Sequence, residues 1–171
     1  MVEDGGPAPD FDLPTDEGGR IRLSGFKGTP VVVYFYPKDD TSGCTAEAKD
    51  FSRLASEFAK AGVPVIGISP DGVDRHAKFR AKYDLTLPLA SDTEKQVASA
   101  YGVWVEKSMY GRKYMGVERT TFLIDADGRI ATSWRRVKVP GHAEAVLTAA
   151  QELKARSVTA GNAGRTKPAT G

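Results

Sequence analysis

The 171-residue sequence predicts an α/β protein with a central mixed β-sheet flanked by helices. Short runs at 31–36, 63–68 and 120–124, the first of them continuously apolar, have the composition of buried strands. Between and after these runs, apolar residues recur every three or four positions, which is the spacing of a helix that buries one face. The alternation of the two patterns along the chain is the basis of the fold prediction.

The N-terminal part of the chain is expected to form a β-hairpin, a buried strand and a helix. Apolar and polar residues alternate at 11–13 and again at 21–23, on either side of a turn-rich stretch, which predicts the hairpin. The apolar run at 31–36 predicts the strand. An apolar face then recurs over 44–61, and Gly62 follows as a helix end.

The remaining elements continue the alternation. After the second apolar run, helices are expected over 73–83 and 94–101, and a turn at 125–128 joins the third run to a strand at 129–134. The apolar face of a closing helix comprises Ala143, Val146, Leu147, Ala150 and Leu153. This order of a hairpin, a βαβα unit, a second hairpin and a helix is that of a thioredoxin-like fold with an N-terminal hairpin extension.

Composition and charge indicate one domain over 1–155 and a disordered basic tail over 156–171. The formal net charge is +2, but the tail holds three of the basic residues, which leaves 21 basic against 22 acidic residues in the body. A nearly neutral body gives no electrostatic reason for binding nucleic acid or a membrane. The longest apolar run is far too short to cross a bilayer.

Cys44 is the one cysteine of the chain, so it cannot form an internal disulfide. No secretory signal is visible at the N-terminus, which is acidic and rich in glycine. A cytoplasmic, reducing location fits both observations best.

Cys44 is placed where a helix begins after the loop that follows the first buried strand. Unpaired N–H groups and the positive end of the helix dipole favour a thiolate there, and a thiolate is the reactive nucleophile. Pro37 and Gly43 are expected to bend the loop, and Thr41 places a hydroxyl three residues before the thiol, close enough to donate to a bound oxygen. The alternative is a buried, inert cysteine, but the neighbouring serine, glycine, threonine and alanine argue against it.

The run from Tyr34 to Thr45, with Pro37, Thr41 and Cys44 in a Pro-x-x-x-Thr-x-x-Cys pattern, resembles the motif of the peroxiredoxins. It is more closely similar to their bacterioferritin-comigratory, or PrxQ, subfamily, and the likeness covers about residues 7–154. It includes the segments 9–14, 67–69, 101–108 and 119–125.

The resemblance implies the roles of the site residues. Cys44 would attack the peroxide and become a sulfenic acid, Thr41 would orient the peroxide, and Pro37 would shield the thiolate. Arg119 would hold the thiolate and stabilise the charge on the leaving oxygen. Glu47 matches a position that can hold the arginine in place. The alternative, nearly as well supported, is that Glu47 only interacts favourably with the positive end of the helix dipole.

The chain departs from many members of that subfamily because it has no second, resolving cysteine. The positions where others place it are occupied by Lys49 and by residues 79–81. The sulfenic acid must therefore be reduced by an external thiol: thioredoxin, glutaredoxin or a small thiol. Lys49 is interpreted as a solvated helix lysine in preference to a group that stabilises the approaching thiolate.

Other motifs point to no cofactor or metal. Asp125-Ala126-Asp127-Gly128 resembles the start of a calcium loop, but acidic ligands are missing downstream, so a hairpin turn is expected. His76 and His142 are expected to be solvated, since neither has a ligand partner at metal spacing. Nucleotide-binding motifs and a Cys-x-x-Cys pair are also absent from the sequence.

Three functions remain open at this point. A thiol-dependent peroxidase for hydrogen peroxide and organic hydroperoxides is the preferred one, acting as a monomer or weak homodimer. A peroxide sensor or redox relay would share the oxidation of Cys44 but would pass the oxidation to a partner protein. A holdase would need exposed apolar surface, which the sequence does not indicate.

Overall fold

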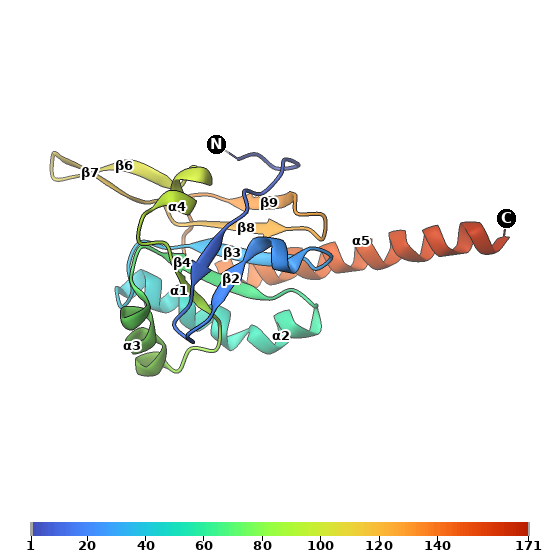
Figure 1. The fold of residues 1–171 in the computed structure, drawn as a ribbon, viewed down its shortest axis with the longest axis horizontal. Helices are drawn as coiled ribbons and strands as arrows, with labels where there is room; N and C mark the ends of the chain where they lie inside the picture. Colours follow the sequence, from blue (N-terminus) through green and yellow to red (C-terminus); the bar gives the residue numbers. More distant parts are fainter. Residues whose placement is uncertain (1, 171) are drawn as a thin grey trace.

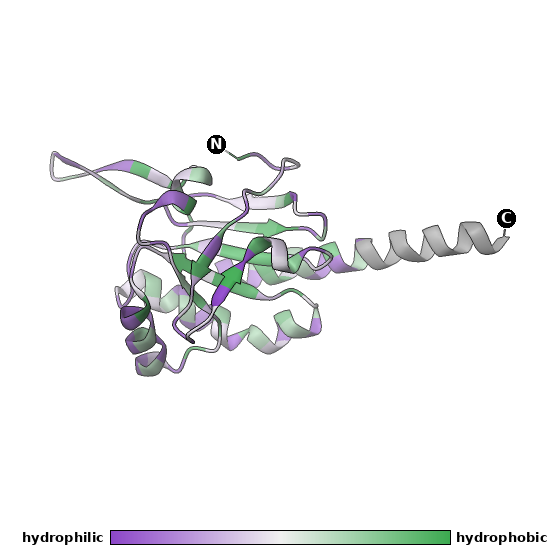
Figure 2. Cartoon of the chain, in the orientation of Figure 1, coloured by the Kyte–Doolittle hydropathy of each residue, from purple (hydrophilic) through white to green (hydrophobic). Residues whose placement is uncertain are grey.

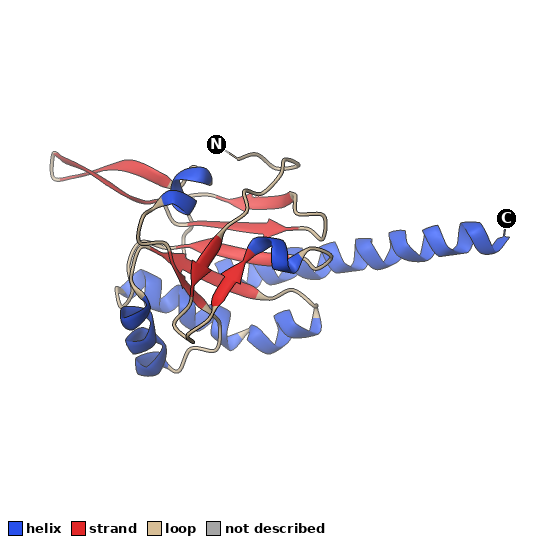
Figure 3. Cartoon of the chain, viewed as in Figure 1, coloured by secondary structure: helices blue, strands red, loops and turns tan. Residues whose placement is uncertain are grey.

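The computed structural model describes residues 2–170, with the side chains of residues 2–156. Five strands form the central sheet in the order β5-β4-β3-β8-β9 (Figures 1 and 3). Their bounds are β3 Val31–Phe35, β4 Val65–Ser69, β5 Leu89–Ser91, β8 Thr120–Ile124 and β9 Ile130–Trp134. Strands β3, β4 and β5 run parallel, whereas β8 pairs antiparallel with both β3 and β9. The predicted mixed sheet is confirmed.

Within the described part of the chain, two separate hairpins and six helical segments surround the sheet. The hairpins are β1–β2, which is the predicted N-terminal extension, and β6–β7, which projects from the body (Figure 1). The bounds of these elements are β1 Asp12–Pro14, β2 Arg20–Arg22, β6 Trp104–Met109, β7 Arg112–Val117, the short 3-10 helix Leu23–Phe26, α1 Ser42–Arg53, α2 Ala55–Lys60, α3 Val73–Tyr83, α4 Gln96–Ala100 and α5 His142–Thr170.

Side chains of alternate residues in the central strand β3 supply two different hydrophobic cores. Val32 and Tyr34 point into a core shared with α1, α2, α3 and α5, whereas Val31, Val33 and Phe35 point into a core shared with the N-terminal hairpin and α4. All five residues of β3 are buried. The sequence of this strand is continuously apolar because helices and loops cover both faces of the sheet. Figure 2 shows the hydrophobic colouring of the sheet strands.

The helix predicted over 44–61 is interrupted, because α1 ends at Arg53 and α2 begins at Ala55. At the break, the Ser52 carbonyl accepts a hydrogen bond from the hydroxyl of Thr86, at 3.3 Å. A side chain that bonds to the backbone in this way interrupts the regular helical ladder. The predicted helices 73–83 and 94–101 correspond to α3 and α4, the latter shorter at both ends.

The sequence analysis missed three of the described strands, β5, β6 and β7. β5 is a three-residue strand, too short to show a pattern. In β6 and β7 most residues are exposed or half-buried, and several of them are charged. These strands therefore lack the alternation of apolar and polar residues that burial of one face produces. Their turn has positive φ angles at Tyr110 and Gly111, which is typical of a two-residue hairpin turn.

The predicted disordered tail comprises residues 156–171, of which only Arg156 has a described side chain. The disorder of the tail and the domain boundary at 155 both stay predictions.

Among the described residues, no helix is long and apolar enough to cross a membrane. The turn expected at 125–128 is confirmed, with the Asp125 carboxylate accepting hydrogen bonds from the N–H groups of Asp127 and Arg129 at 3.0 Å.

The prediction that both histidines are solvated is wrong. His76 is fully buried and His142 is 7% exposed. Nε2 of His142 lies 2.8 Å from the hydroxyl of Thr121, and its ring packs edge-on against Phe51 and Trp134. Both histidines lie on the apolar faces of their helices, where tertiary packing supplies their polar partners.

The burial of His142 predicts a pH dependence of stability. Burial, aided by the charge of Arg119, lowers the pKa of His142 from 6.5 to about 4. Below pH 6.5 the unfolded chain therefore binds a proton that the folded chain excludes, and the stabilising contribution is lost as the pH falls toward 4. The loss should be at most about 3 kcal/mol. Urea unfolding of the parent and of His142→Gln, measured from pH 7 to pH 4, should converge by that amount; parallel curves would contradict the assignment.

Candidate active site

Cys44 lies in the first turn of α1, as predicted. Thr41 is the residue before the helix, with extended backbone, and its carbonyl accepts the hydrogen bond of the Thr45 N–H at 2.8 Å. The thiol side chain is only 1% exposed. It therefore combines the electrostatic advantage of a helix N-terminus with exclusion from bulk water.

Arg119 contacts the thiol, although it is 75 residues away in sequence. It immediately precedes β8, whose first residue Thr120 pairs with Phe35 at the end of β3. Since α1 follows β3 through a short loop, this register brings the guanidinium to the start of α1. Its Nη2 donates to Sγ of Cys44 at 3.3 Å.

Glu47 holds the other arm of the same guanidinium. Arg119 Nη1 donates to Oε1 of Glu47 at 2.7 Å, and the carboxylate is 1% exposed. Burial raises the pKa of Glu47 to about 7, although the adjacent Arg119 opposes this shift. Burial lowers the pKa of Arg119, but the interactions with Glu47 and Cys44 outweigh this effect, so the pKa of Arg119 is raised overall. The expected contact between Glu47 and the arginine is present.

Gly43 provides space for the arginine. A Cβ atom at this position would lie 3.1 Å from Nη2 of Arg119, which is tighter than ordinary packing allows. Gly43 is not among the described glycines with a positive φ angle, so its importance comes from this close approach and not from the expected bend. Pro37 is half-buried in the loop between β3 and α1.

Thr41 is exposed and lies beside the first turn of α1, but its hydroxyl does not have the orientation that the sequence suggested. Oγ1 donates to the Lys38 carbonyl at 2.9 Å. The proton of the hydroxyl is thus directed into the loop, and its oxygen presents lone pairs. A bound peroxide can donate its own O–H to this oxygen.

Lys107 of β6 is a half-buried cation that the sequence analysis did not single out. Its stem packs on Gly116 of the neighbouring strand, with Cδ 3.2 Å from the position of an added Cβ. Burial lowers the pKa of Lys107, as does Arg119, while Cys44 acts in the opposite direction. The charge of Lys107 is therefore coupled to those of Arg119 and Cys44. No sequence signal marked it, since the β6–β7 hairpin itself was not predicted.

The two positions at which related chains place a second cysteine have different environments here. Lys49 is exposed on α1, with Nζ 5.8 Å from the centre of the Tyr83 ring, as expected of a solvated lysine. On α3, Phe79 is part of the core, and Arg80 forms an ion pair with Asp16 at 2.5 Å. Neither position offers a group that could resolve a sulfenic acid.

A thioredoxin-like sheet that places an arginine beside a buried thiol at a helix N-terminus defines a thiol peroxidase of the thioredoxin superfamily. The model of the AhpC/TSA family matches residues 5–133. The chain belongs to this family and to its Bcp, or PrxQ, peroxiredoxin group.

Relatives of known name support this assignment over most of the chain. The putative peroxiredoxin bcp of Coxiella burnetii is 51% identical over 146 residues, covering 85% of this chain and 97% of its own length. Peroxiredoxin Bcp of Bacillus subtilis is 47% identical, covering 86% and 94%.

Solved structures give the same result. The bacterioferritin comigratory protein of Xanthomonas campestris, whose structure concerns its alkyl peroxide reduction activity, superposes with a TM-score of 0.81 at 42% identity, over 84% of this chain and 92% of that one. A mutant of PrxQ from Xylella fastidiosa superposes with a TM-score of 0.84 at 38% identity, over 92% and 98%.

Proposed function

We propose that this protein reduces hydrogen peroxide and organic hydroperoxides through Cys44 and is regenerated by an external thiol. The observation that supports this most strongly is the 3.3 Å contact between Sγ of Cys44 and Nη2 of Arg119. A cation that donates to the reacting sulfur is also placed to stabilise the negative charge on the oxygen that leaves when the O–O bond of the peroxide breaks. The alkyl peroxide reduction of the Xanthomonas relative supports the substrate class.

In the first step, the Cys44 thiolate attacks one oxygen of the peroxide. A sulfur–oxygen bond forms as the oxygen–oxygen bond breaks, and the leaving oxygen takes up a proton to give water or an alcohol. Arg119 stabilises the negative charge on that oxygen, Thr41 accepts the peroxide O–H, and Pro37 limits water around the sulfur. Glu47 and Gly43 are supporting residues: one holds Arg119, and the other leaves room for it.

In the second step, an external thiol attacks the sulfur of the Cys44 sulfenic acid. A mixed disulfide forms and water leaves, and a second thiol then releases Cys44 as a disulfide of the donor forms. The sum is one peroxide and two thiols converted to an alcohol or water, a further water and one disulfide. An external donor is required because the chain has a single cysteine.

The remaining assignments are part of the same proposal. The donor is thioredoxin, a glutaredoxin or a small thiol, and the protein works in the cytoplasm as a monomer or weak homodimer. It needs no cofactor and acts without nucleic acid or membrane. Its single cysteine, which cannot form an internal disulfide, supports the location.

The experiment that tests the proposal is peroxide consumption with a panel of donors: dithiothreitol, glutathione with glutaredoxin, and the thioredoxin system. We expect repeated turnover with at least one of them. Oxidation of Cys44 in one stoichiometric event, with transfer to a partner protein and no turnover with any donor, would instead establish a sensor or relay.

A sulfenic acid that waits for an external thiol is exposed to further oxidation. We therefore expect progressive inactivation at millimolar peroxide, with Cys44 converted to sulfinic acid. Mass spectrometry should find a gain of two oxygen atoms on the peptide that contains Cys44, in proportion to lost activity. Raising the donor concentration should protect the enzyme. Unchanged turnover after repeated exposure would contradict this expectation.

A further inference from the structure

The loop that joins β3 to α1 contains a buried carboxylate that the peroxidase chemistry leaves unused. Asp39 is 1% exposed, two residues before Thr41. Its Oδ1 accepts the hydroxyl of Tyr36 at 2.6 Å, and its Oδ2 lies 2.6 Å from Nδ1 of His76 on α3. Its backbone N–H donates to Asp71 at 2.8 Å. The middle of the loop is thus fixed by side chain and backbone together.

The ring of His76 is held in one orientation. Its Nε2 lies 3.1 Å from the carbonyl of Ala90 in β5, and because a carbonyl can only accept, this nitrogen carries a proton. Asp39 and His76 are both buried and both have their partners, which is the condition under which polar groups are tolerated in a protein interior.

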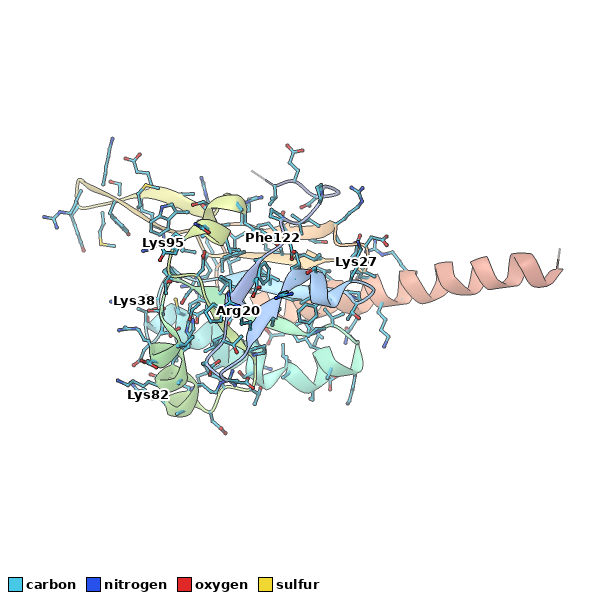
Figure 4. All side chains as sticks on the ribbon, in the orientation of Figure 1. Arg20, Lys27, Lys38, Lys82, Lys95 and Phe122 are labelled. Atoms are coloured by element: carbon cyan, nitrogen blue, oxygen red, sulfur yellow. The ribbon has the colours of Figure 1, made fainter. Side chains whose placement is uncertain are left out.

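A second set of contacts ties the next residue of the loop to the same helix. Asp40 has a φ angle of 61°, an uncommon conformation for a residue other than glycine. Its carboxylate accepts hydrogen bonds from Lys82 at 2.8 Å and from Tyr83 at 2.6 Å, both at the end of α3. Figure 4 shows Lys38 of the loop and Lys82 of the helix on the same side of the molecule. Strained backbone of this kind persists where the surroundings hold it.

Helix α3 is itself anchored. Arg80 bonds to Asp16 in the N-terminal hairpin turn at 2.5 Å and to the carbonyl of Leu87 at 2.5 Å. The loop before Cys44 therefore packs against α3, which the contacts of Arg80 hold in place.

We propose that Asp39 and His76 are positioning residues for the reaction of Cys44 with peroxide. Their buried pair holds the loop so that Thr41 and the first turn of α1 present the peroxide to the sulfur in the reactive geometry. The inference rests on the proposed peroxidase function. It predicts that breaking the pair slows oxidation of Cys44 although neither residue contacts the sulfur.

A metal site is the competing interpretation, because Asp39, Asp71 and His76 could present three ligand atoms within 4.8 Å of one another. These atoms already have hydrogen-bond partners within the protein. Nδ1 of His76 is paired with Asp39, and Oδ2 of Asp71 accepts from the Asp39 N–H and from Ser69 at 2.7 Å. The hydrogen bonds account for the cluster.

The test compares single-turnover oxidation of Cys44 by hydrogen peroxide in Asp39→Ala and Asp39→Asn, followed by rapid quench and mass spectrometry. Alanine leaves His76 and Tyr36 without their partner, and we expect a loss of about tenfold to 100-fold, as a small displacement at a reacting centre can cause. Asparagine can still accept from Tyr36 and donate to Nδ1 of a neutral His76. We expect it to restore the rate to within about threefold of the parent.

A double-mutant cycle separates positioning from general destabilisation. In the parent, Thr41→Val should slow oxidation; in the Asp39→Ala background it should change the rate by less than about threefold, because the hydroxyl is no longer presented. Val146→Ala, which removes buried volume from α5, is the stability control and should leave the rate unchanged. Additive effects of the two loop variants would overturn the proposal.

The outcomes distinguish this inference from the function on which it rests. A parent protein whose Cys44 fails to react with peroxide would refute the peroxidase itself. A reactive parent with a folded Asp39→Ala variant of equal rate would refute the positioning role only. Loss of the parent's rate with EDTA and its return with zinc would also overturn the proposal, in favour of the metal interpretation.

Discussion

Replacing Cys44 with serine is expected to abolish peroxide reduction, with a loss of about 10⁴-fold or more. A serine hydroxyl does not ionise near neutral pH and has no sulfur on which to accept the peroxide oxygen. The substitution changes one atom in a buried position beside Arg119, so the fold should survive. Peroxide consumption with the best donor, together with the thermal unfolding of the variant, measures both properties.

Methionines provide a matched control, since they are the other side chains of the chain that peroxide oxidises readily. Met109 and Met115 are 56% and 50% exposed on the β6–β7 hairpin. Turnover should be unchanged when both are replaced with leucine. A Cys44→Ser protein that still turned over would show that another group reacts, and one that still prevented aggregation of a client protein would support the holdase.

The elements that the sequence predicted well are those whose burial leaves a simple pattern. The strands β3, β4 and β8 are buried at every residue, so each stands out in the sequence as a short, mainly apolar segment. Helix α3 was predicted at its observed bounds, Val73–Tyr83. Burial leaves no such pattern in β6 and β7, which project from the body, or in the three residues of β5. The break at Leu54 depends on a contact with Thr86, which lies far along the chain.

The candidate site divides in a similar way. Cys44 and Thr41 could be identified from a local motif, because a helix N-terminus is set by the residues around it. Arg119 and Glu47 were inferred from a resemblance, and their contact depends on the register of β3 against β8. The pair of Asp39 and His76 could not be predicted, since isolated polar residues are equally compatible with solvent. One signal was available: His76 lies three residues before Phe79 on the buried face of α3.

Loss of Arg119 is expected to have the second largest effect. Arg119→Ala removes the donor 3.3 Å from the sulfur, and the rate of Cys44 oxidation should fall by about 10²-fold to 10³-fold, as when one donor to a developing oxyanion is removed. Arg119→Lys should recover only part of this, because an ammonium group cannot serve Cys44 and Glu47 with two fixed donors. Single-turnover kinetics with hydrogen peroxide measures the effect.

Two further variants separate chemistry from stability. Arg136→Ala removes an arginine that is 87% exposed and paired with Glu118, so it should leave the rate within about twofold of the parent. Arg119→Ala also strands the buried Glu47 carboxylate, a cost to folding that Glu47→Gln should relieve. In the double variant, Glu47→Gln with Arg119→Ala, stability should return while oxidation stays slow. A rate that recovered together with stability would mean that Arg119 maintains the fold of the site and takes no part in cleaving the peroxide.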